Sequence, residues 1–403
     1  MIRRLLNDVH KSTRHKGFNI IDNIILHNGK PDVKQRPCTC IVLSKALIKY
    51  IDNMLFRDFN EPMLHLVFEE LAAVSSYVIE NIYRCAGAVI LEGGRVVTWG
   101  NKFYGGDSSR VAAELMSGVK EVVATSYAFA ALKEGGSVVT WGDEDFGGDS
   151  SMVAGKLASG VVMVVATGGA FTALTEGRHV VSWGDVDGGG VSSMVEGTLV
   201  NRVVATSGAF AAITDSGRVM TWGYAMDGAD SSKVAMDIES DVVKVVATGS
   251  AFAALTKGGK VVTWGDAEDG GDSSKVVREI ESGVVEVTAT WSAFAAVTES
   301  GKVVTWGNTD YGGDNSEVAG KLASGVVEVA ASWYAFAAVI SGGQVVSWGE
   351  AKWGGDSSAV EEKLASGVVK VVEVSKYKFA ALKEDGSVVE WGNNNEFDWI
   401  FIL

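Results

Sequence analysis

The chain has 403 residues, of which 47% are hydrophobic and 21% are charged, a balance that is ordinary for a globular protein and excludes a disordered chain. The net charge of −15 is unevenly spread, because residues 1–85 carry 12 Lys and Arg against 9 Asp and Glu, and residues 86–403 carry 23 against 41. So acidic a second part repels phosphates, which argues against direct nucleic-acid binding and favours basic protein partners.

The first 85 residues differ in composition from the rest. They hold all three prolines, all three cysteines and four of the five histidines, but no tryptophan. The apolar stretch 63–83 contains three glutamates, so it predicts an amphipathic helix rather than a membrane span. We predict a mainly helical segment over residues 1–85, whose basic start is more typical of a solvated helical terminus than of an organelle transit peptide. No membrane association is predicted.

The three cysteines, Cys38, Cys40 and Cys85, make a poor disulfide framework. This favours a reducing, intracellular location, either cytoplasmic or nuclear. Cys38 and Cys40 have no second cysteine pair and no histidine at finger-like spacing. No metal site and no cofactor are therefore predicted.

After residue 85 the sequence is a repeat. Each unit contains a β-branched run, two apolar runs around a turn, and a serine-containing segment, which predict three strands and one short helical element. Such a sheet cannot bury both faces alone, so the copies must pack against one another. Trp-Gly pairs mark the units at spacings of 42, 42, 39, 42, 42, 42 and 43, beginning at Trp99, Trp141, Trp183, Trp222, Trp264, Trp306, Trp348 and Trp391.

A glycine recurs in the turn between the two apolar runs, where a positive φ is expected. The second complete unit breaks the pattern: its glycine comes one residue early, at Gly177, and Arg178 takes the usual place. We predict that this turn has a different shape. The turn glycines of the other copies are Gly94, Gly136, Gly217, Gly259, Gly301, Gly343 and Gly386.

Three segments, "LKEDGSVVEWGNN", "LTESGKVVTWGNTDYGG" and "LKEGGSVVTWGDEDFGG", resemble the repeat of the RCC1 (regulator of chromosome condensation) family over roughly residues 78–395. That family's repeat has a Leu-Thr-x-Asp-Gly-x-Val turn, then Trp-Gly and a glycine-rich connector. The resemblance implies a β-propeller, most often of seven blades. This chain departs from the family in its shorter units and in having Thr-x-x-Ala where Gly-x-x-His is common. It resembles a divergent member with short repeats.

The predicted fold is accordingly all-β, with an RCC1-like propeller over residues 86–403 after the helical segment. Seven blades are preferred and eight are the alternative, because the partial copy over residues 85–100 can be counted as a further hairpin. That hairpin and the apolar tail 397–403 would compete to complete or cap the ring, since an unpaired strand edge promotes aggregation.

The Trp-Gly tryptophans are predicted to be structural, because one large apolar residue per unit suits packing between blades. Trp291 and Trp333 differ, since other units have Ser, Gly or Lys there. In RCC1-like ultraviolet photoreceptors a tryptophan lies nearby within Gly-Trp-Arg-His-Thr. Here Ser292 and Tyr334 follow instead, which argues against a photoreceptor. We predict either an aromatic patch for a partner or partial burial.

The acidic connector after each Trp-Gly pair has two interpretations. Asp143, Asp145 and Asp149 have the spacing of oxygen ligands in a calcium loop. Sister copies lose these residues, so the preferred role is a glycine turn in which Asp or the first Ser caps the short helix. Collectively the connectors could form an acidic interaction surface, whose candidate residues are Asp107, Asp149, Asp230, Asp272, Asp314 and Asp356.

No catalytic residues are predicted. The single histidine of the repeats, His179, lies in a turn without a nucleophile or acid–base partner in a recognisable pattern. We therefore predict a non-catalytic protein-interaction scaffold with an acidic surface. The resemblance leaves two alternatives open: a guanine-nucleotide exchange factor for a small GTPase, and the substrate-recognition arm of a ubiquitin ligase.

Overall fold

The computed structural model describes residues 78–80 and 86–393, all of which belong to the unit Thr39–Leu403. Predictions for residues 1–77, including most of the helical segment and of the helix over 63–83, lie outside the described residues, as do those for Cys85 and the tail 397–403. Residues Val78–Glu80 form a β-strand, so the predicted helix is wrong over these three residues, because their backbone pairs with residues 87–89. No helix in the described part of the chain is long and apolar enough to cross a membrane.

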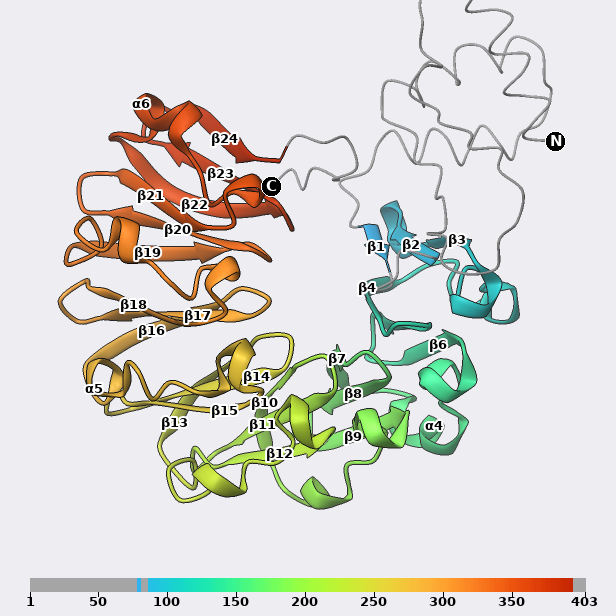
Figure 1. The fold of residues 1–403 in the computed structure, drawn as a ribbon. Coiled ribbons are helices and arrows are strands. Elements are labelled where there is room, and N and C mark those ends of the chain that lie inside the picture. Colours follow the sequence, from blue (N-terminus) through green and yellow to red (C-terminus); the bar gives the residue numbers. More distant parts are fainter. Residues whose placement is uncertain (1–77, 81–85, 394–403) are drawn as a thin grey trace, which may run out of the picture. The chain divides into compact units, whose positions relative to one another are not determined.

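The described residues form eight three-stranded antiparallel sheets that follow one another in chain order (Figure 1). In every sheet the second strand pairs with both the first and the third, so each is a simple meander. The sheets comprise β1 Val78–Glu80, β2 Ala86–Ile90 and β3 Val96–Gly100; β4 Val119–Ala124, β5 Ala128–Lys133 and β6 Val138–Gly142; β7 Val161–Ala166, β8 Ala170–Thr175 and β9 Val180–Gly184; β10 Val200–Ala205, β11 Ala209–Thr214 and β12 Val219–Gly223; β13 Val242–Ala247, β14 Ala251–Thr256 and β15 Val261–Gly265; β16 Val284–Ala289, β17 Ala293–Thr298 and β18 Val303–Gly307; β19 Val326–Ala331, β20 Ala335–Ile340 and β21 Gln344–Gly349; β22 Val368–Ser375, β23 Lys378–Lys383 and β24 Val388–Gly392.

Middle strands of the inner sheets are buried on both faces because a neighbouring sheet covers each face. In β14 the residues alternate between the two neighbours, as the period of a strand requires. Phe252 packs in one core cluster with Ala211 of the preceding sheet. Ala253 and Leu255 pack in another with Phe294 of the following sheet. Repeated meanders stacked face to face in this way are the blades of a β-propeller, which confirms the predicted all-β fold class.

The first sheet is the smallest, because its outer strand β1 has only three residues. It pairs with β2 in a short antiparallel register, so the partial copy of the repeat does form a sheet. The choice between a ring of seven blades and one of eight stays a prediction.

Each connector between sheets is held in place by one buried aliphatic side chain. Short helical turns follow the glycines, and three of them continue as one-turn α-helices: α4 Ala154–Leu157, α5 Val277–Ile280 and α6 Glu361–Leu364. The predicted short helical element is therefore present. The anchoring side chains, all at most 2% exposed, are Leu115, Leu157, Val195, Ile238, Ile280, Leu322 and Leu364.

The hairpin turn between the second and third strands keeps one shape even where its glycine is missing. The turn glycines have φ between +74° and +81°. Arg178 adopts φ +63° itself. Its N–H donates to the Thr175 carbonyl at 2.7 Å and its own carbonyl accepts from Val200 N at 3.0 Å, the bonds that Gly136 makes in the unit before. The prediction of a different turn was wrong, because these hydrogen bonds hold Arg178 in a left-handed conformation that costs a side chain about 1 kcal/mol.

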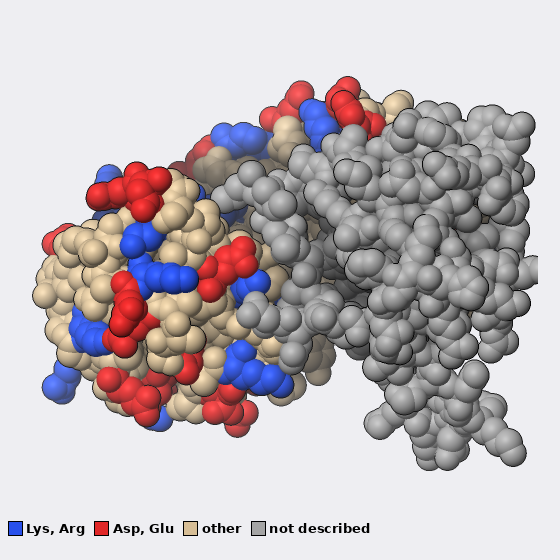
Figure 2. All heavy atoms as spheres, turned by 90° about the horizontal axis from the view of Figure 1, so that it is seen from above, with Lys and Arg blue, Asp and Glu red and all other residues tan. Residues whose placement is uncertain are grey.

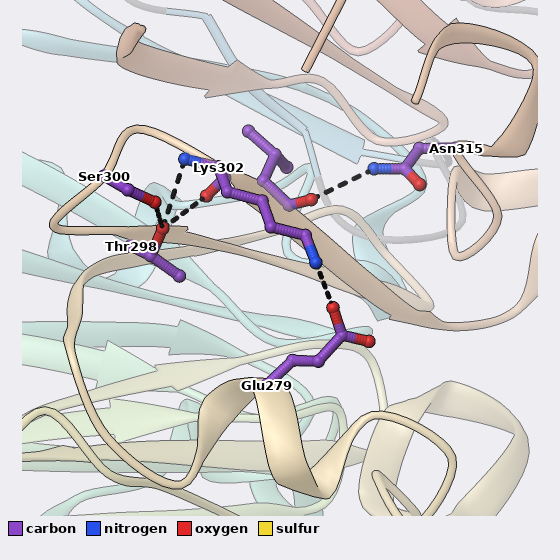
Figure 3. A network of polar contacts seen from close by, with 6 residues as sticks. Glu279, Thr298, Ser300, Lys302 and Asn315 are labelled. Atoms are coloured by element: carbon purple, nitrogen blue, oxygen red, sulfur yellow. Dashed lines mark hydrogen bonds and ion pairs between the residues drawn. The ribbon is translucent and has the colours of Figure 1, made fainter. Parts of the chain in front are cut away.

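Exposed ion pairs join the same turn to the helical connector. Lys302, between β17 and β18, forms an ion pair with Glu279 of α5, and its backbone N–H donates to Thr298 Oγ1 at 3.1 Å (Figure 3). Lys260 and Asp237 repeat the ion pair one unit earlier, at 2.5 Å. Exposed pairs of this kind contribute about 0–1 kcal/mol, so we assign them a minor structural role.

Candidate functional site

The turn between the first and second strands brings neighbouring sheets into direct backbone contact. At this edge, hereafter the turn edge, one residue per unit donates its N–H to the carbonyl of the equivalent residue in the next unit, at 2.6–3.2 Å. Side chains that are one repeat apart in sequence therefore lie side by side here. The residues of this ladder, in chain order, are Ser126, Gly168, Ser207, Gly249, Trp291, Trp333 and Lys376.

The ladder brings the predicted pair Trp291 and Trp333 together. Their rings stack with centroids 4.7 Å apart and an interplanar angle of 20°. Lys376 Nζ lies 3.7 Å from the Trp333 ring centroid, and a Cβ placed on Gly249 would lie only 2.9 Å from the Trp291 ring. Both tryptophans are half-buried. Partial burial is therefore confirmed for both tryptophans, and a role of the stacked pair as a patch for a partner stays a prediction.

Two further rows of residues run beside the ladder and contact each other. The rings of Tyr311 and Tyr334 are 5.0 Å apart, those of Tyr334 and Trp353 are 5.8 Å apart, and those of Trp353 and Tyr377 are 4.3 Å apart. We name the row formed by the residues that follow the ladder residues in the chain the turn row, and the row formed by residues of the connectors the connector row. The turn row is Tyr127, Gly169, Gly208, Ser250, Ser292, Tyr334 and Tyr377, and the connector row is Tyr104, Phe146, Gly188, Asp227, Asp269, Tyr311 and Trp353.

The two rows are aromatic at both ends and small or acidic in the middle. At the N-terminal end Tyr127 contacts Tyr104 and Phe146, with ring centroids 4.8 and 4.4 Å apart. In the middle Asp227 lies over Gly208, where an added Cβ would be 2.3 Å from its Oδ2, and it is hydrogen-bonded to Ser250. The same position of the repeat thus accepts an aromatic residue, a glycine or an aspartate.

The electrostatics of this middle segment are set by burial and by neighbouring carboxylates. Burial raises the pKa of Asp227, the hydrogen bond from Ser250 lowers it, and the nearby Asp266 and Asp269 carboxylates raise it. The pKa of Tyr311 is also raised, by burial first and then by Asp269 and two further carboxylates. Within the described ranges, no lysine or arginine forms an ion pair with Asp227, Asp266 or Asp269.

Sequence reasoning identified Trp291 and Trp333 but missed Tyr311, Tyr334, Trp353 and Tyr377. The same signal could have found them. Each of the four stands at a repeat position where sister copies have Gly, Ser or Asp. They were missed because no local motif marks them, and their proximity to one another depends on how closely the sheets approach.

The six predicted acidic residues are exposed and each holds a local turn. In each of these six copies a carboxylate oxygen accepts a hydrogen bond from the backbone N–H two residues later, as Asp149 does from Ser151 at 2.8 Å. Asp149 therefore supplies the capping hydrogen bond, whereas the side chain of Ser150, which stands at the N-cap position, bonds to Thr140. The hydrogen bonds that Asp149 accepts from the backbone and side chain of Ser151 lower the pKa of its carboxyl group. The other pairs are Asp107 with Ser109, Asp230 with Ser232, Asp272 with Ser274, Asp314 with Ser316 and Asp356 with Ser358.

Acidic and basic side chains are interspersed on the described face in Figure 2, with no continuous acidic patch there. Among the residues that the structure describes, no group of three or more His, Cys, Asp or Glu is placed to hold a metal ion. The charge of the chain therefore does not by itself define a site on the face in view.

The Trp-Gly tryptophans lie between neighbouring sheets. Trp183 is 4% exposed, stacks on Phe171 at 5.3 Å and donates from Nε1 to the Gly147 carbonyl of the preceding connector at 3.0 Å. Trp141, Trp264, Trp306, Trp348 and Trp391 repeat this bond. Trp222, in the shortened unit, is equally buried but its Nε1 has no hydrogen-bond partner. Trp99 is half-buried and lies against Gly87, where the other copies have phenylalanine.

Comparison with known proteins gives structural similarities only. No family model and no curated protein matches the chain. The ectodomain of the Physcomitrella patens receptor kinase CR4 is 15% identical, with 68% of this chain and 73% of that chain covered and a TM-score of 0.40. Prp20p from Saccharomyces cerevisiae, whose structure was reported with its binding to Gsp1p and histones, is 16% identical, with 60% and 74% covered and a TM-score of 0.36. Yeast RCC1 (Prp20) bound to Kap60 is 16% identical, with 75% and 84% covered and a TM-score of 0.39. At these values the fold class rests on the strand pairing and packing described above.

Proposed function

We propose that this chain is a non-catalytic protein-interaction module whose binding surface is the turn edge. One observation carries the proposal. Large aromatic side chains occupy turn-edge positions in the last units, while the middle units build the same turns with glycine, serine or aspartate. The fold does not require those rings, and half-buried aromatic residues are enriched in protein interfaces.

The layout of the surface suits a protein segment. The ladder and its two flanking rows run across successive sheets, so the surface is elongated and offers a series of contacts one unit apart. Its rings supply apolar contact area, while the negative charge of residues 86–403 disfavours nucleic acids. No described residue favours the exchange-factor or ubiquitin-ligase alternative over this function, and both stay predictions from the sequence resemblance.

The test is affinity capture with the full chain and a Trp291→Ser/Trp333→Ser variant, followed by mass spectrometry. Serine is the residue of sister copies at this position, at Ser126 and Ser207, so the variant is expected to fold. A matched control, Met152→Ser/Met236→Ser, removes two side chains that are 96% and 94% exposed elsewhere in the repeats.

We expect at least one protein partner that the wild type and the methionine control retain and that the tryptophan variant loses at least tenfold. Circular dichroism melting checks that all three chains are folded. A tryptophan variant that is folded and retains the same partners at the same recovery would contradict the proposed binding surface.

A further inference from the structure

We infer that the partner presents a basic, arginine-bearing segment, whose guanidinium groups pair with Asp227 and Asp269 and stack on Tyr311 at the turn edge. This inference rests on the proposed function and names the chemistry of its partner. Asp227 and Asp269 stand at the same position in consecutive units, between the two aromatic ends of the connector row.

The spacing of these two carboxylates is set by the step between sheets. That step is short at the turn edge, as the 4.7 Å between the Trp291 and Trp333 rings shows. Asp269 and Asp266 are close enough to Asp227 to raise its pKa. Like charges so placed disfavour one another's ionisation, and a cation from outside relieves that repulsion.

No lysine or arginine among the described residues neutralises this group. Some acids elsewhere on the described surface are paired with a lysine, as Glu390 is with Lys378 of the adjacent strand at 2.8 Å and Asp237, in the connector before β13, is with Lys260 at 2.5 Å. No such pair reaches Asp227 or Asp269 within the described ranges. Because Asp227 is also partly removed from water, a cation that binds there meets less competition from solvent than at a fully exposed carboxylate.

Tyr311 supplies the aromatic face. One side of its ring stacks on Tyr334, and the residues next along the two rows on its other side are Ser292 and Asp269. The rings of this edge already bind cations within the chain, since Lys376 lies over Trp333 and Lys352 lies 4.8 Å from the Trp353 ring centroid. Arginine fits better than lysine, because its planar guanidinium stacks on a ring and donates to a carboxylate simultaneously.

The experiment measures binding of a fluorescent peptide of alternating arginine and glycine to the full chain by fluorescence anisotropy. The test variant is Asp227→Asn/Asp269→Asn. The matched control, Asp230→Asn/Asp272→Asn, changes the same charge in the same two units. Asparagine can still accept the hydrogen bonds from Ser232 and Ser274, so the turns are kept.

We expect the dissociation constant of the peptide to rise at least tenfold in the test variant and to change less than twofold in the control. Equal weakening in both variants would mean that net charge alone attracts the peptide, and it would overturn the inference. Absence of binding to the wild type, or unchanged binding to the test variant, would overturn it as well.

A Tyr311→Asp variant tests the stacking part, because Asp is what the two preceding units have at this position. In the wild type we expect the arginine peptide to bind about threefold more tightly than its lysine counterpart, as a partly exposed cation–π contact implies. The variant is expected to lose that preference while still binding the lysine peptide. An unchanged preference would overturn the stacking.

Failure here is distinguishable from failure of the proposed function. If capture is lost in Trp291→Ser/Trp333→Ser but arginine peptides do not bind, the turn edge is an interface for a partner of other chemistry, and only the inference is overturned. If that variant retains every partner, the proposed function itself is overturned.

Discussion

The interior of the sheet stack and the turn edge differ in how strictly the repeat is kept. Each complete unit has the same buried Phe and Trp, which stack at 5.2–5.4 Å. At the turn edge the same positions vary between glycine, aspartate, tyrosine and tryptophan. The first and second strands keep the same pairing in these units except in the last, where an additional register shift lies between Glu373 and Ser375. The copies of a repeat can therefore be compared with one another. Residues common to all copies serve the fold, and large residues found in only some copies are candidates for function.

The largest expected effect tests the interior side of this comparison. Phe252→Ala removes a ring that is fully buried between two sheets and is expected to destabilise the protein by about 3–5 kcal/mol. Trp291→Ser, at the turn edge, is expected to change stability by less than about 1 kcal/mol. Urea unfolding followed by circular dichroism measures both. Comparable destabilisation by the two substitutions would remove the distinction between fold and function.

A smaller effect concerns the one turn that breaks the glycine pattern. Arg178→Gly is expected to stabilise the protein by about 1 kcal/mol, because glycine has no steric penalty at positive φ. The lost ion pair with Asp215 offsets part of this gain, and the offset is small because the Asp215 side chain is 61% exposed, although that of Arg178 is only 37% exposed. Arg178→Ala, which loses the ion pair but keeps the strain, is the control in thermal unfolding. A glycine variant no more stable than the alanine variant would contradict the argument.

The smallest effect is a pH dependence at the turn edge. The pKa of Asp227 is raised in the folded state, so the folded chain binds that proton more tightly than the unfolded chain. Its ionisation therefore lowers stability as the pH rises from the unfolded value towards the folded pKa. Asp227→Asn is expected to gain most over the wild type at neutral pH, with a gain that shrinks as the pH falls towards 4. Asp149→Asn, whose parent carboxyl has a lowered pKa, is expected to show no such gain at neutral pH.

Much of the architecture follows from the sequence. The repeat spacing and the apolar runs predict three strands and one connector per unit, and the structure has that unit in chain order. The structural role of the acidic connector, a turn held by an aspartate, was also predictable, because the hydrogen bond from Ser151 N–H to Asp149 spans only two residues. Arg178 was mispredicted for a related reason: a residue's own preference was weighed, but the hydrogen bonds to Thr175 and Val200 decide its conformation.

The sequence by itself therefore determined the repeating unit, its buried aromatic residues and its local turns, because these depend on contacts within one copy or on a pattern present in all copies. Only the tertiary structure decided which edge of each sheet approaches the next. Trp291 and Trp333 are 42 residues apart, and their stacking depends on backbone hydrogen bonds between sheets at the turn edge. The same approach sets Tyr311 beside Tyr334 and leaves Asp227 and Asp269 together between aromatic ends, since closeness between copies is a property of the stack and not of any one unit.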